Sequence, residues 1–500
     1  MAAQAQSCPK YQRRRPQLTP CYQIVNEHLD TFVAAREAEN RPLPEYVLEE
    51  FEAYLKCGIP AFGFLRLKCG SCHEEKIVAF SCKKRGFCPS CCAKRQAETA
   101  AHLVDNILPL APYRQMVLSF PVPLRYWLQT NKKLYAKIHA IVIKEMHRYY
   151  INKAKLAGIE KAYPGSISFT QRAGSAANLN PHMHVLLLDG VYTEVNGVVR
   201  FRNIDVITDD EVAWLCENIA KKVMQHLTKQ GYLDKNGEVV QNPLMDELFL
   251  DNEAITLAAT CSIAGKIAFG INAGKYVTKI GSGFGYLEEI PLAKGKRCYS
   301  VNGFSLHCNT AINTHARDRL EKLIEYIARG PLSNERLEIT SDGKVKLQLK
   351  SSWNDGTTHL LFTPGEFLEK LAAIIPPPKS HLVRWGGVFA GNSPLRKKIV
   401  LKPEAKKGFE FGADGKKVKN KSWSLTLSRV FKIDVLKCDC GGDLKPLGAV
   451  QDPNQVRKYL KHVNIDYDPP VRGPPRLVQD SFEFDHPPQF DDYEAAIPID

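Results

Sequence analysis

The chain has 500 residues, 44% of them apolar, which is long enough for two to four domains and apolar enough to bury their cores. No stretch approaches about 18 uninterrupted apolar residues and no apolar signal core stands at its beginning, so we expect no transmembrane helix and a cytoplasmic location. The formal net charge is +14, and residues 477–500 hold seven acids without any Lys or Arg, so the preceding chain is more basic still. That charge favours a polyanionic partner, most simply nucleic acid, over a merely soluble basic surface.

Helical patterns at 24–37 and 45–55 precede a dense group of cysteines. Seven of the fifteen cysteines lie between Cys57 and Cys92, which in a chain without an export signal indicates metal ligands rather than disulfides. Two C-x-x-C pairs predict one tetrahedral zinc site in a zinc ribbon, with the ligands Cys69, Cys72, Cys88 and Cys91. Cys57, Cys82 and His73 could complete or replace this set, or serve as structural thiols and a surface histidine.

The basic triplet inside the ribbon, Lys83, Lys84 and Arg85, would face phosphates or form a solvated loop. Beyond it we expect helices at 95–108, 134–156, 208–231, 313–329, 367–374 and 423–431, and strands at 114–121, 166–171, 185–188, 343–349 and 358–362. This order is typical of an α+β protein. Residues 235–300 show little pattern, and the Pro-rich, acidic tail from about 465 is expected to be disordered.

The most informative strand carries His182 and His184 at its start and is closed by a turn at Asp189. Residues i and i+2 of a strand share a face, so the two imidazoles would form half of a metal site. A hairpin with the strand at 166–171 would bring Gln171 close to them. Two packed or surface histidines are the alternative for so short a motif.

The helix at 313–329 carries Tyr326 on its last turn, before Gly330. Tyr326 lies beside an apolar stripe formed by Leu320, Leu323 and Ile327, so an amphipathic core tyrosine remains a possible interpretation. Near the other end of the chain, Cys438 and Cys440 form a lone C-x-C pair, which supplies only two ligands, and we expect no metal there.

Several of these stretches occur together, and in the same order, in one known family. From about residue 45 to 450 the chain resembles the rolling-circle transposases of the insertion sequence 91 class and their common-region relatives, which belong to the HUH endonucleases. In that family the late cysteine pair usually has C-P-x-C spacing, which is longer than the spacing here. The resemblance rests on residues 80–91 (FSCKKRGFCPSC), 118–125 (LSFPVPLR), 171–192 (QRAGSAANLNPHMHVLLLDGVY), 304–307 (FSLH), 326–337 (YIARGPLSNERL) and 353–359 (WNDGTTH).

The resemblance implies an α+β fold in which a zinc ribbon precedes an HUH-type nuclease domain built on an antiparallel sheet, followed by a basic C-terminal region. We accordingly expect an N-terminal helical segment (1–50), a zinc-ribbon DNA-binding domain (51–100), a catalytic transposase domain (105–345), a basic C-terminal DNA-binding region (346–450) and a tail (451–500), acidic and disordered at its end. Tyr326 has no second tyrosine four residues away, since 322 is Lys and 330 is Gly, which points to the single-tyrosine branch.

The resemblance also implies the chemistry: a nuclease–ligase that cuts and rejoins single-stranded transposon ends and target DNA, acting at the nucleoid of a bacterial cell. Tyr326 would form a 5′-phosphotyrosine, with Tyr276 and Tyr299 as its nearest rivals. Mg²⁺ or Mn²⁺ would be held by His182 and His184 with Gln171, or His307, as third ligand. Contacts to DNA phosphates would come from Lys83, Lys84, Arg85 and Arg329. A plasmid replication initiator or relaxase, and a zinc-ribbon DNA-binding regulator without catalysis, are the alternatives.

Overall fold

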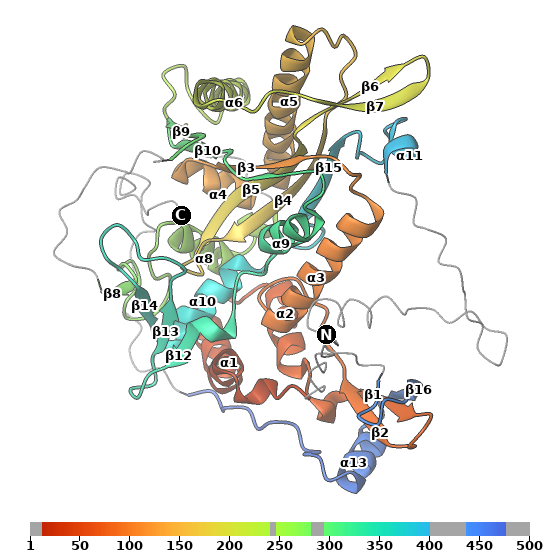
Figure 1. Cartoon of the computed structure of the whole chain (residues 1–500). Coiled ribbons are helices and arrows are strands. Elements are labelled where there is room, and N and C mark those ends of the chain that lie inside the picture. The colour runs from red at the N-terminus through yellow and green to blue at the C-terminus, as the bar shows by residue number, and fades with distance from the viewer. Residues whose placement is uncertain (1–12, 241–246, 282–294, 401–436, 477–500) are drawn as a thin grey trace.

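The computed structural model describes residues 13–240, 247–281, 295–400 and 437–476 (Figure 1). The helices of these ranges are α1 Pro20–Ala38, α2 Glu45–Lys56, α3 Pro89–Asn106, α4 Val122–Thr130, α5 Lys132–Leu156, α6 Asp209–Lys229, α7 Glu247–Leu250, α8 Glu253–Ile263, α9 Arg317–Ile327, α10 Pro364–Ile374, α11 Arg396–Ile399 and α13 Pro453–His462. Within the same ranges, none of the helices combines the length and apolar composition that a membrane crossing requires.

The strands form four antiparallel sheets in the described part of the chain. The strands are β1 Phe64–Cys69, β2 Glu75–Ala79, β3 Tyr113–Ser119, β4 Gly165–Ala173, β5 Leu179–Leu188, β6 Gly190–Val195, β7 Val198–Asn203, β8 Thr278–Ile280, β9 Cys298–Val301, β10 Phe304–His307, β11 Ala311–Ile312, β12 Leu337–Ile339, β13 Val345–Gln348, β14 His359–Phe362, β15 Val383–Gly387 and β16 Leu444–Val450. The largest sheet has the order β15-β4-β5-β3-β10-β9, with β11 beside β3, and it lies at the centre of the molecule (Figure 1).

Side chains alternate between the two faces of this central sheet, and apolar side chains are buried on both. Met116, Leu118, Met183 and Val185 point to one face and join the large core that contains residues of α4, α5, α6 and α8. The other face packs against α3 and α9, through a second core that includes Tyr113, Ile167, Phe169, Leu186 and Leu188. The sheet therefore separates two helical layers, and it is the α3–α9 side that carries the candidate site.

Local sequence signals explain why several helices begin where they do. Thr208 and Glu211 form a reciprocal capping box at the start of α6, and Thr363 and Glu366 do the same at α10. Asn131 accepts a hydrogen bond from the backbone N–H of Leu134 and caps α5. These polar side chains satisfy donors that the first turn of a helix leaves without an intrahelical partner.

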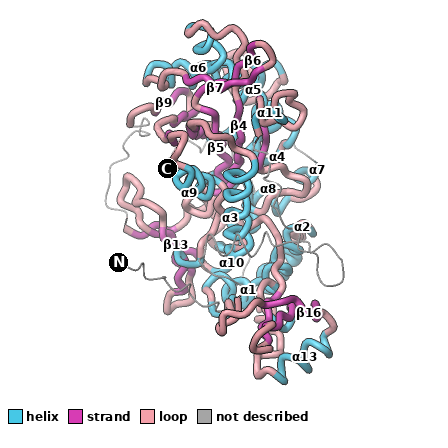
Figure 2. Tube along the Cα trace, turned by 45° about the vertical axis from the view of Figure 1, so that its right-hand side comes forward, coloured by secondary structure: helices cyan, strands magenta, loops and turns pink. Residues whose placement is uncertain are grey.

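Three smaller units surround the central sheet. The order β12-β13-β14-β8 forms one sheet, β6 and β7 form a projecting hairpin, and β16-β1-β2 forms a sheet with α13 at one end of the molecule (Figures 1 and 2). Helix α1 packs on α10, and β1 pairs with β16, so segments distant in sequence share packing. The domain boundaries expected from the sequence stay a prediction.

Most of the predicted elements are confirmed, but several elements of the described residues were not predicted, among them α4, α8, α13 and the β6–β7 hairpin. Helix α8 was not predicted, because its residues are almost uniformly apolar and small and give no amphipathic period; it is buried in the core. The disorder expected from about 465 does not extend over 465–476, where Arg472 pairs with Asp30 and Glu52, and the N–H of Gly473 donates to the carbonyl of Asn26. The helix predicted at 423–431 lies outside the described residues, as does 477–500.

The register of the central sheet is fixed by a buried ion pair between β3 and the end of β5. Arg114, only 2% exposed, donates to both carboxylate oxygens of Asp189, at 3.0 and 2.7 Å, and to the carbonyl of Cys308 at 2.8 Å. The hydroxyl of Tyr150 on α5 donates to the same carboxylate at 2.9 Å. This network links two strands, the end of β10 and a helix.

We expect Arg114→Leu to destabilise the protein by about 3 kcal/mol, because removing one partner leaves the other charge poorly compensated. The measurement is the thermal midpoint, followed by near-UV circular dichroism. Arg319→Leu, at an exposed position of α9, is the control and should leave the midpoint nearly unchanged. Equal midpoints for both variants would show that the ion pair contributes little.

Candidate active site and metal centres

The two histidines predicted as metal ligands lie next to each other on one face of β5. In the register of the sheet, His182 is opposite Gln171 of β4 on one side and Ser119 of β3 on the other. The ring centroids of His182 and His184 are 5.0 Å apart. The predicted hairpin is thus confirmed, and it brings Gln171 directly beside the pair.

Hydrogen bonds orient both imidazoles through their Nδ1 atoms. Nδ1 of His182 lies 2.7 Å from the carbonyl oxygen of Asn180, which can only accept, so Nδ1 carries the proton and Nε2 keeps its lone pair. Nδ1 of His184 lies 2.7 Å from the side-chain amide nitrogen of Gln115 on β3, and among the described residues its buried Nε2 has no hydrogen-bond partner. With the Gln115 amide turned so that its oxygen accepts from Nδ1–H, Nε2 keeps the lone pair that a metal needs. A buried nitrogen without a partner beside a second bare imidazole nitrogen fits a metal site.

Both imidazoles are held neutral, as metal ligation requires. Burial lowers the pKa of His182 to about 4, even though its hydrogen bond to the carbonyl of Asn180 acts in the opposite direction. Burial first, and then the nearby His182, Arg329 and Lys350, lower the pKa of His184 to about 2. At neutral pH neither ring is protonated, so a cation does not have to displace a proton.

Tyr326 reaches the histidine pair from α9, on the same side of the sheet. Its ring stands edge-on to that of His184, with the centroids 6.1 Å apart, and it is 47% exposed. The guanidinium of Arg329 lies over the tyrosine ring, 4.3 Å from its centroid. The amide nitrogen of Gln171 donates to the carbonyl of Ile327 at 2.8 Å, which ties the end of α9 to β4.

The rival residues lie elsewhere. The hydroxyl of Tyr299 donates to Glu217 on α6 at 2.8 Å, and the ring of Tyr276 makes a cation–π contact with the ammonium of Lys266. His307 on β10 is opposite Val117 on β3, and Val117 is in turn opposite His184 on β5. Two strand spacings, roughly 10 Å, therefore separate His307 from His184.

A pocket of about 310 Å³ opens beside Gln171 and the end of α9. None of its lining residues, all within the described ranges, is an Asp or Glu, and its cationic side chains are Arg85, Arg95, Arg172, Arg329 and Lys350. Three of these also donate to backbone carbonyls: Arg172 to the last carbonyls of α10, Arg95 to those of Lys83 and Lys84, and Arg85 to that of Ser380. The pocket is therefore suited to an anion such as a phosphate.

The four residues predicted to contact DNA are not equivalent in the structure. Arg85 and Arg329 line this pocket from opposite parts of the sequence. Lys84 pairs with Glu49 at 3.2 Å on the surface, and Lys83 lies in the loop that Arg95 holds. The structure brings Arg85 and Arg329 together at one cavity and leaves the two lysines outside its lining.

Eight cysteines of the described residues form two clusters rather than the one predicted. Cys57, Cys82, Cys88 and Cys91 make the first cluster, and Cys69, Cys72, Cys438 and Cys440 make the second, with the four ligand atoms of each within 4.8 Å of one another. The residues considered as substitutes, Cys57 and Cys82, are thus full members of the first cluster, and the C-x-C pair expected to bind no metal belongs to the second.

The length of the β1–β2 hairpin explains why the two C-x-x-C pairs do not meet. Cys69 and Cys72 lie at its turn, whereas Cys57 and Cys82 flank its open end. Five residue steps from Phe64 to Cys69 span about 17 Å. No single ion can be bound by cysteines at both ends of such a hairpin.

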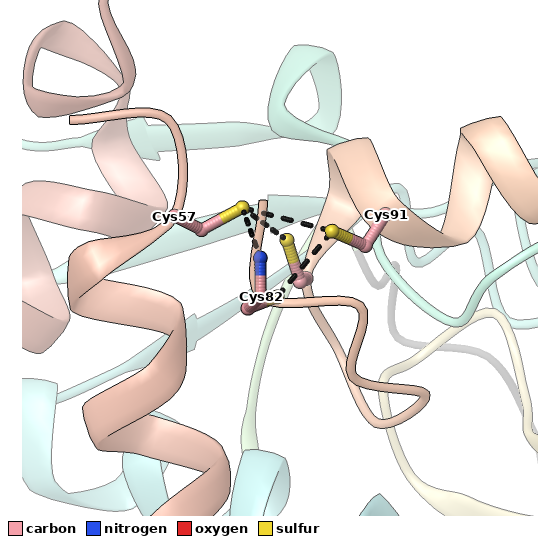
Figure 3. Close-up of side chains that lie close together, drawn as sticks. Cys57, Cys82 and Cys91 are labelled. Carbon is pink, nitrogen blue, oxygen red and sulfur yellow. Dashed lines mark hydrogen bonds between the residues drawn. The ribbon is translucent and has the colours of Figure 1, made fainter. Parts of the chain in front are cut away.

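The first cluster joins the end of α2, the segment after β2 and the start of α3 (Figure 3). Sulfur–sulfur distances are 3.6 Å between Cys57 and Cys91, 3.4 Å between Cys82 and Cys91 and 3.7 Å between Cys57 and Cys88. Four sulfurs around a tetrahedral zinc lie about 3.8 Å apart, since each Zn–S bond is about 2.3 Å. Hydrogen bonds among the four thiols lower the pKa values of Cys57 and Cys91 and raise those of Cys82 and Cys88, so without a cation the protons are shared within the cluster.

Comparison with protein families agrees with these features. Residues 24–120 match a family model described as "Transposase zinc-binding domain", the zinc-binding model of the insertion sequence 91 transposases. Residues 165–397 match a second model, described as "Putative transposase", which covers the strands and the helix that carry the histidine pair and Tyr326. This protein is a transposase of the insertion sequence 91 class. Searches of the curated proteins and of the solved structures gave no significant match.

The family assignment and the clusters together support structural zinc in this transposase, and they imply DNA as its partner. Sequence reasoning did not find two contributors. Gln115 holds His184 from the neighbouring strand, and only the register, which places it on the same face as the histidines, could have indicated it. Cys440 completes a cluster whose other half lies hundreds of residues away, and no local spacing indicates that.

We expect Cys57→Ser to lower the zinc content of the purified transposase by one equivalent and to reduce its thermal stability, since the metal supplies much of the stability of so small a cluster. Metal content is measured by mass spectrometry on the full chain. Cys261→Ser replaces a buried cysteine outside both clusters and should keep the wild-type zinc content. Equal zinc in Cys57→Ser and wild type would exclude Cys57 as a ligand.

Proposed function

We propose that this transposase moves DNA by a rolling-circle route, in which Tyr326 cuts one strand and remains joined to it until rejoining. The observation that carries the proposal is the placement of Tyr326 against His184, whose buried Nε2 has no hydrogen-bond partner among the described residues. A nucleophile, a cation site and an anion pocket then lie within one region of the surface. Metal-assisted phosphoryl transfer uses these three elements together.

The cation site would be formed by His182, His184 and Gln171. Because the amide nitrogen of Gln171 is used by the carbonyl of Ile327, its amide oxygen is the atom left for a ligand. Hard cations prefer oxygen, and a phosphate oxygen of the DNA would add a further one. Mg²⁺ or Mn²⁺ held there would polarise the phosphoryl oxygens and offset the charge of the transition state.

The protein's own residues account for the covalent step. The hydroxyl oxygen of Tyr326 attacks the phosphorus, an oxygen–phosphorus bond forms, and the bond from phosphorus to the 3′ oxygen breaks. The tyrosine proton leaves to solvent, and the departing oxygen takes up a proton as a free 3′-OH. A 5′-phosphotyrosine ester results, which keeps the energy of the phosphodiester, so that a 3′-OH can reverse the step without ATP.

The pocket explains which groups would hold the strand. Arg329 stacks on Tyr326 and Arg85 enters from the loop of the first cysteine cluster, so both are available to a phosphate next to the one attacked. Such contacts would make binding steeply dependent on salt and largely independent of sequence. Single-stranded DNA fits this arrangement better than a duplex, because its backbone can enter a pocket of this size.

The nucleophile is tested with Tyr326→Phe, which removes one oxygen from a half-exposed ring. The assay uses single-stranded transposon ends in the presence of Mn²⁺. We expect the variant to fold and bind DNA as wild type does, and the denaturant-resistant protein–DNA adduct to disappear. Tyr276→Phe, about equally exposed, is the matched control and should form the adduct as wild type does. An adduct with Tyr326→Phe would disprove the assignment. Adducts formed with replication-origin hairpins but not with transposon ends would instead favour a replication initiator.

The cation site is tested on the same substrates. His182→Ala and His184→Ala should each reduce cleavage at least about 100-fold while leaving DNA binding nearly intact, because phosphate contacts elsewhere supply the affinity. Gln171→Ala should raise the Mn²⁺ concentration needed for half-maximal cleavage by about 10-fold or more, and His307→Ala should not. The reverse order of these two variants would make His307 the third ligand.

A further inference from the structure

The second cysteine cluster joins two segments that are 366 residues apart in the chain. Cys69 and Cys72 come from the turn of the β1–β2 hairpin, and Cys438 and Cys440 precede β16. The sulfur of Cys69 lies 3.5 Å from that of Cys440, and the sulfur of Cys72 lies 3.5 Å from that of Cys438. These separations are close to the spacing of about 3.8 Å expected around a tetrahedral zinc.

Backbone amides surround the sulfurs in the way that stabilises thiolates. The N–H groups of Ser71 and Cys72 point to the sulfur of Cys69, at 3.4 and 3.5 Å. On the other side, the N–H of Gly442 points to the sulfur of Cys440 at 3.4 Å. Donors of this kind orient metal-bound thiolates and offset their charge, so each half of the cluster has the form of a metal-binding turn.

The two turns also fit directly against each other. The N–H of Gly70 donates to the carbonyl of Asp443 and joins the two turns, whereas the N–H of Cys438 donates to the carbonyl of Gly442 within the second turn. A Cβ atom on Gly442 would lie 2.5 Å from the hydroxyl oxygen of Ser71 and 2.7 Å from the sulfur of Cys69, so only glycine fits there. This close approach indicates a built site rather than four thiols that happen to be neighbours.

We propose that Cys69, Cys72, Cys438 and Cys440 bind a second structural zinc ion, which fastens residues 437–476 to the N-terminal zinc-binding region. Four thiolates in a tetrahedron are a donor set that selects zinc. The unit it closes has few buried apolar residues of its own: Phe64, Ile77, Val456 and Leu460 form one small cluster, and Leu67 and Leu444 pack beside the cysteines in another. A three-stranded sheet and one short helix with so small a core need a metal for stability.

The zinc would therefore act as a clasp between distant parts of the chain. It reinforces the pairing of β1 with β16, where Cys69 is opposite Leu444, and the packing of α13 beside it. From α13 the chain continues to α1, where Arg472 pairs with Asp30. Residues 437–476 are thus attached to β1 and α1, both of which belong to the N-terminal zinc-binding region.

The experiment measures zinc per chain on the full-length transposase. Wild type should contain two equivalents. Cys72→Ser/Cys440→Ser, which changes two exposed cysteines, should contain one. Cys298→Ser, at a cysteine outside both clusters, is the control and should contain two.

Hydrogen exchange distinguishes a clasp from a zinc ion without that role. The amides of 444–450 and 453–462 should exchange at least about 10-fold faster in the double variant than in the control, whereas those of β4 and β5 should be unchanged. One zinc in wild type would overturn the proposal whether or not the variants fold. So would two zinc ions in the double variant, or an intact mass lower by two hydrogens for each pair, which would indicate disulfides instead. Unchanged exchange in both segments would overturn the clasp.

Discussion

The candidate site depends on the register between β3 and β5, which the ion pair of Arg114 with Asp189 fixes. Every side chain of the site on these strands points to one face because that register is kept. A shift by a single residue would turn His182 and His184 toward α5 and the large core, and would separate Gln115 from His184. The network also includes Tyr150, so the helix on the opposite face of the sheet holds the register from behind.

Gln171 connects the sheet to the helix that carries the candidate nucleophile. Its position opposite His182 is set by strand pairing, and its amide nitrogen binds the carbonyl of Ile327, the residue after Tyr326. One side chain thus contributes to the cation site and places the end of α9. This coupling gives a physical reason for a glutamine here: an amide has a donor and an acceptor, whereas a carboxylate would repel that carbonyl oxygen.

Features set by residues close together in the sequence could be predicted, and features set by residues far apart in the chain could not. The hairpin of Gln171 with His182, and the helix that ends near Tyr326, could be predicted because alternation and a Gly-Pro stop are local signals. The partition of the cysteines could not, because the spacing of Cys69 from Cys88 says nothing about the hairpin that separates them. Gln115 was missed for the same reason, since its role exists only once β3 lies beside β5.

The first cysteine cluster and the candidate nucleophile are linked by direct packing. Helix α3 begins at that cluster and packs along α9. Gly330, four residues after Tyr326, lies so close to Cys92 that a Cβ atom there would be 2.4 Å from that of the cysteine. Cys92 directly follows Cys91, a member of the first cluster. Arg85 lies in the loop between Cys82 and Cys88 and extends into the pocket beside Arg329. A zinc ion at the first cluster would therefore help to hold the start of α3, and through it the end of α9 that carries the candidate nucleophile.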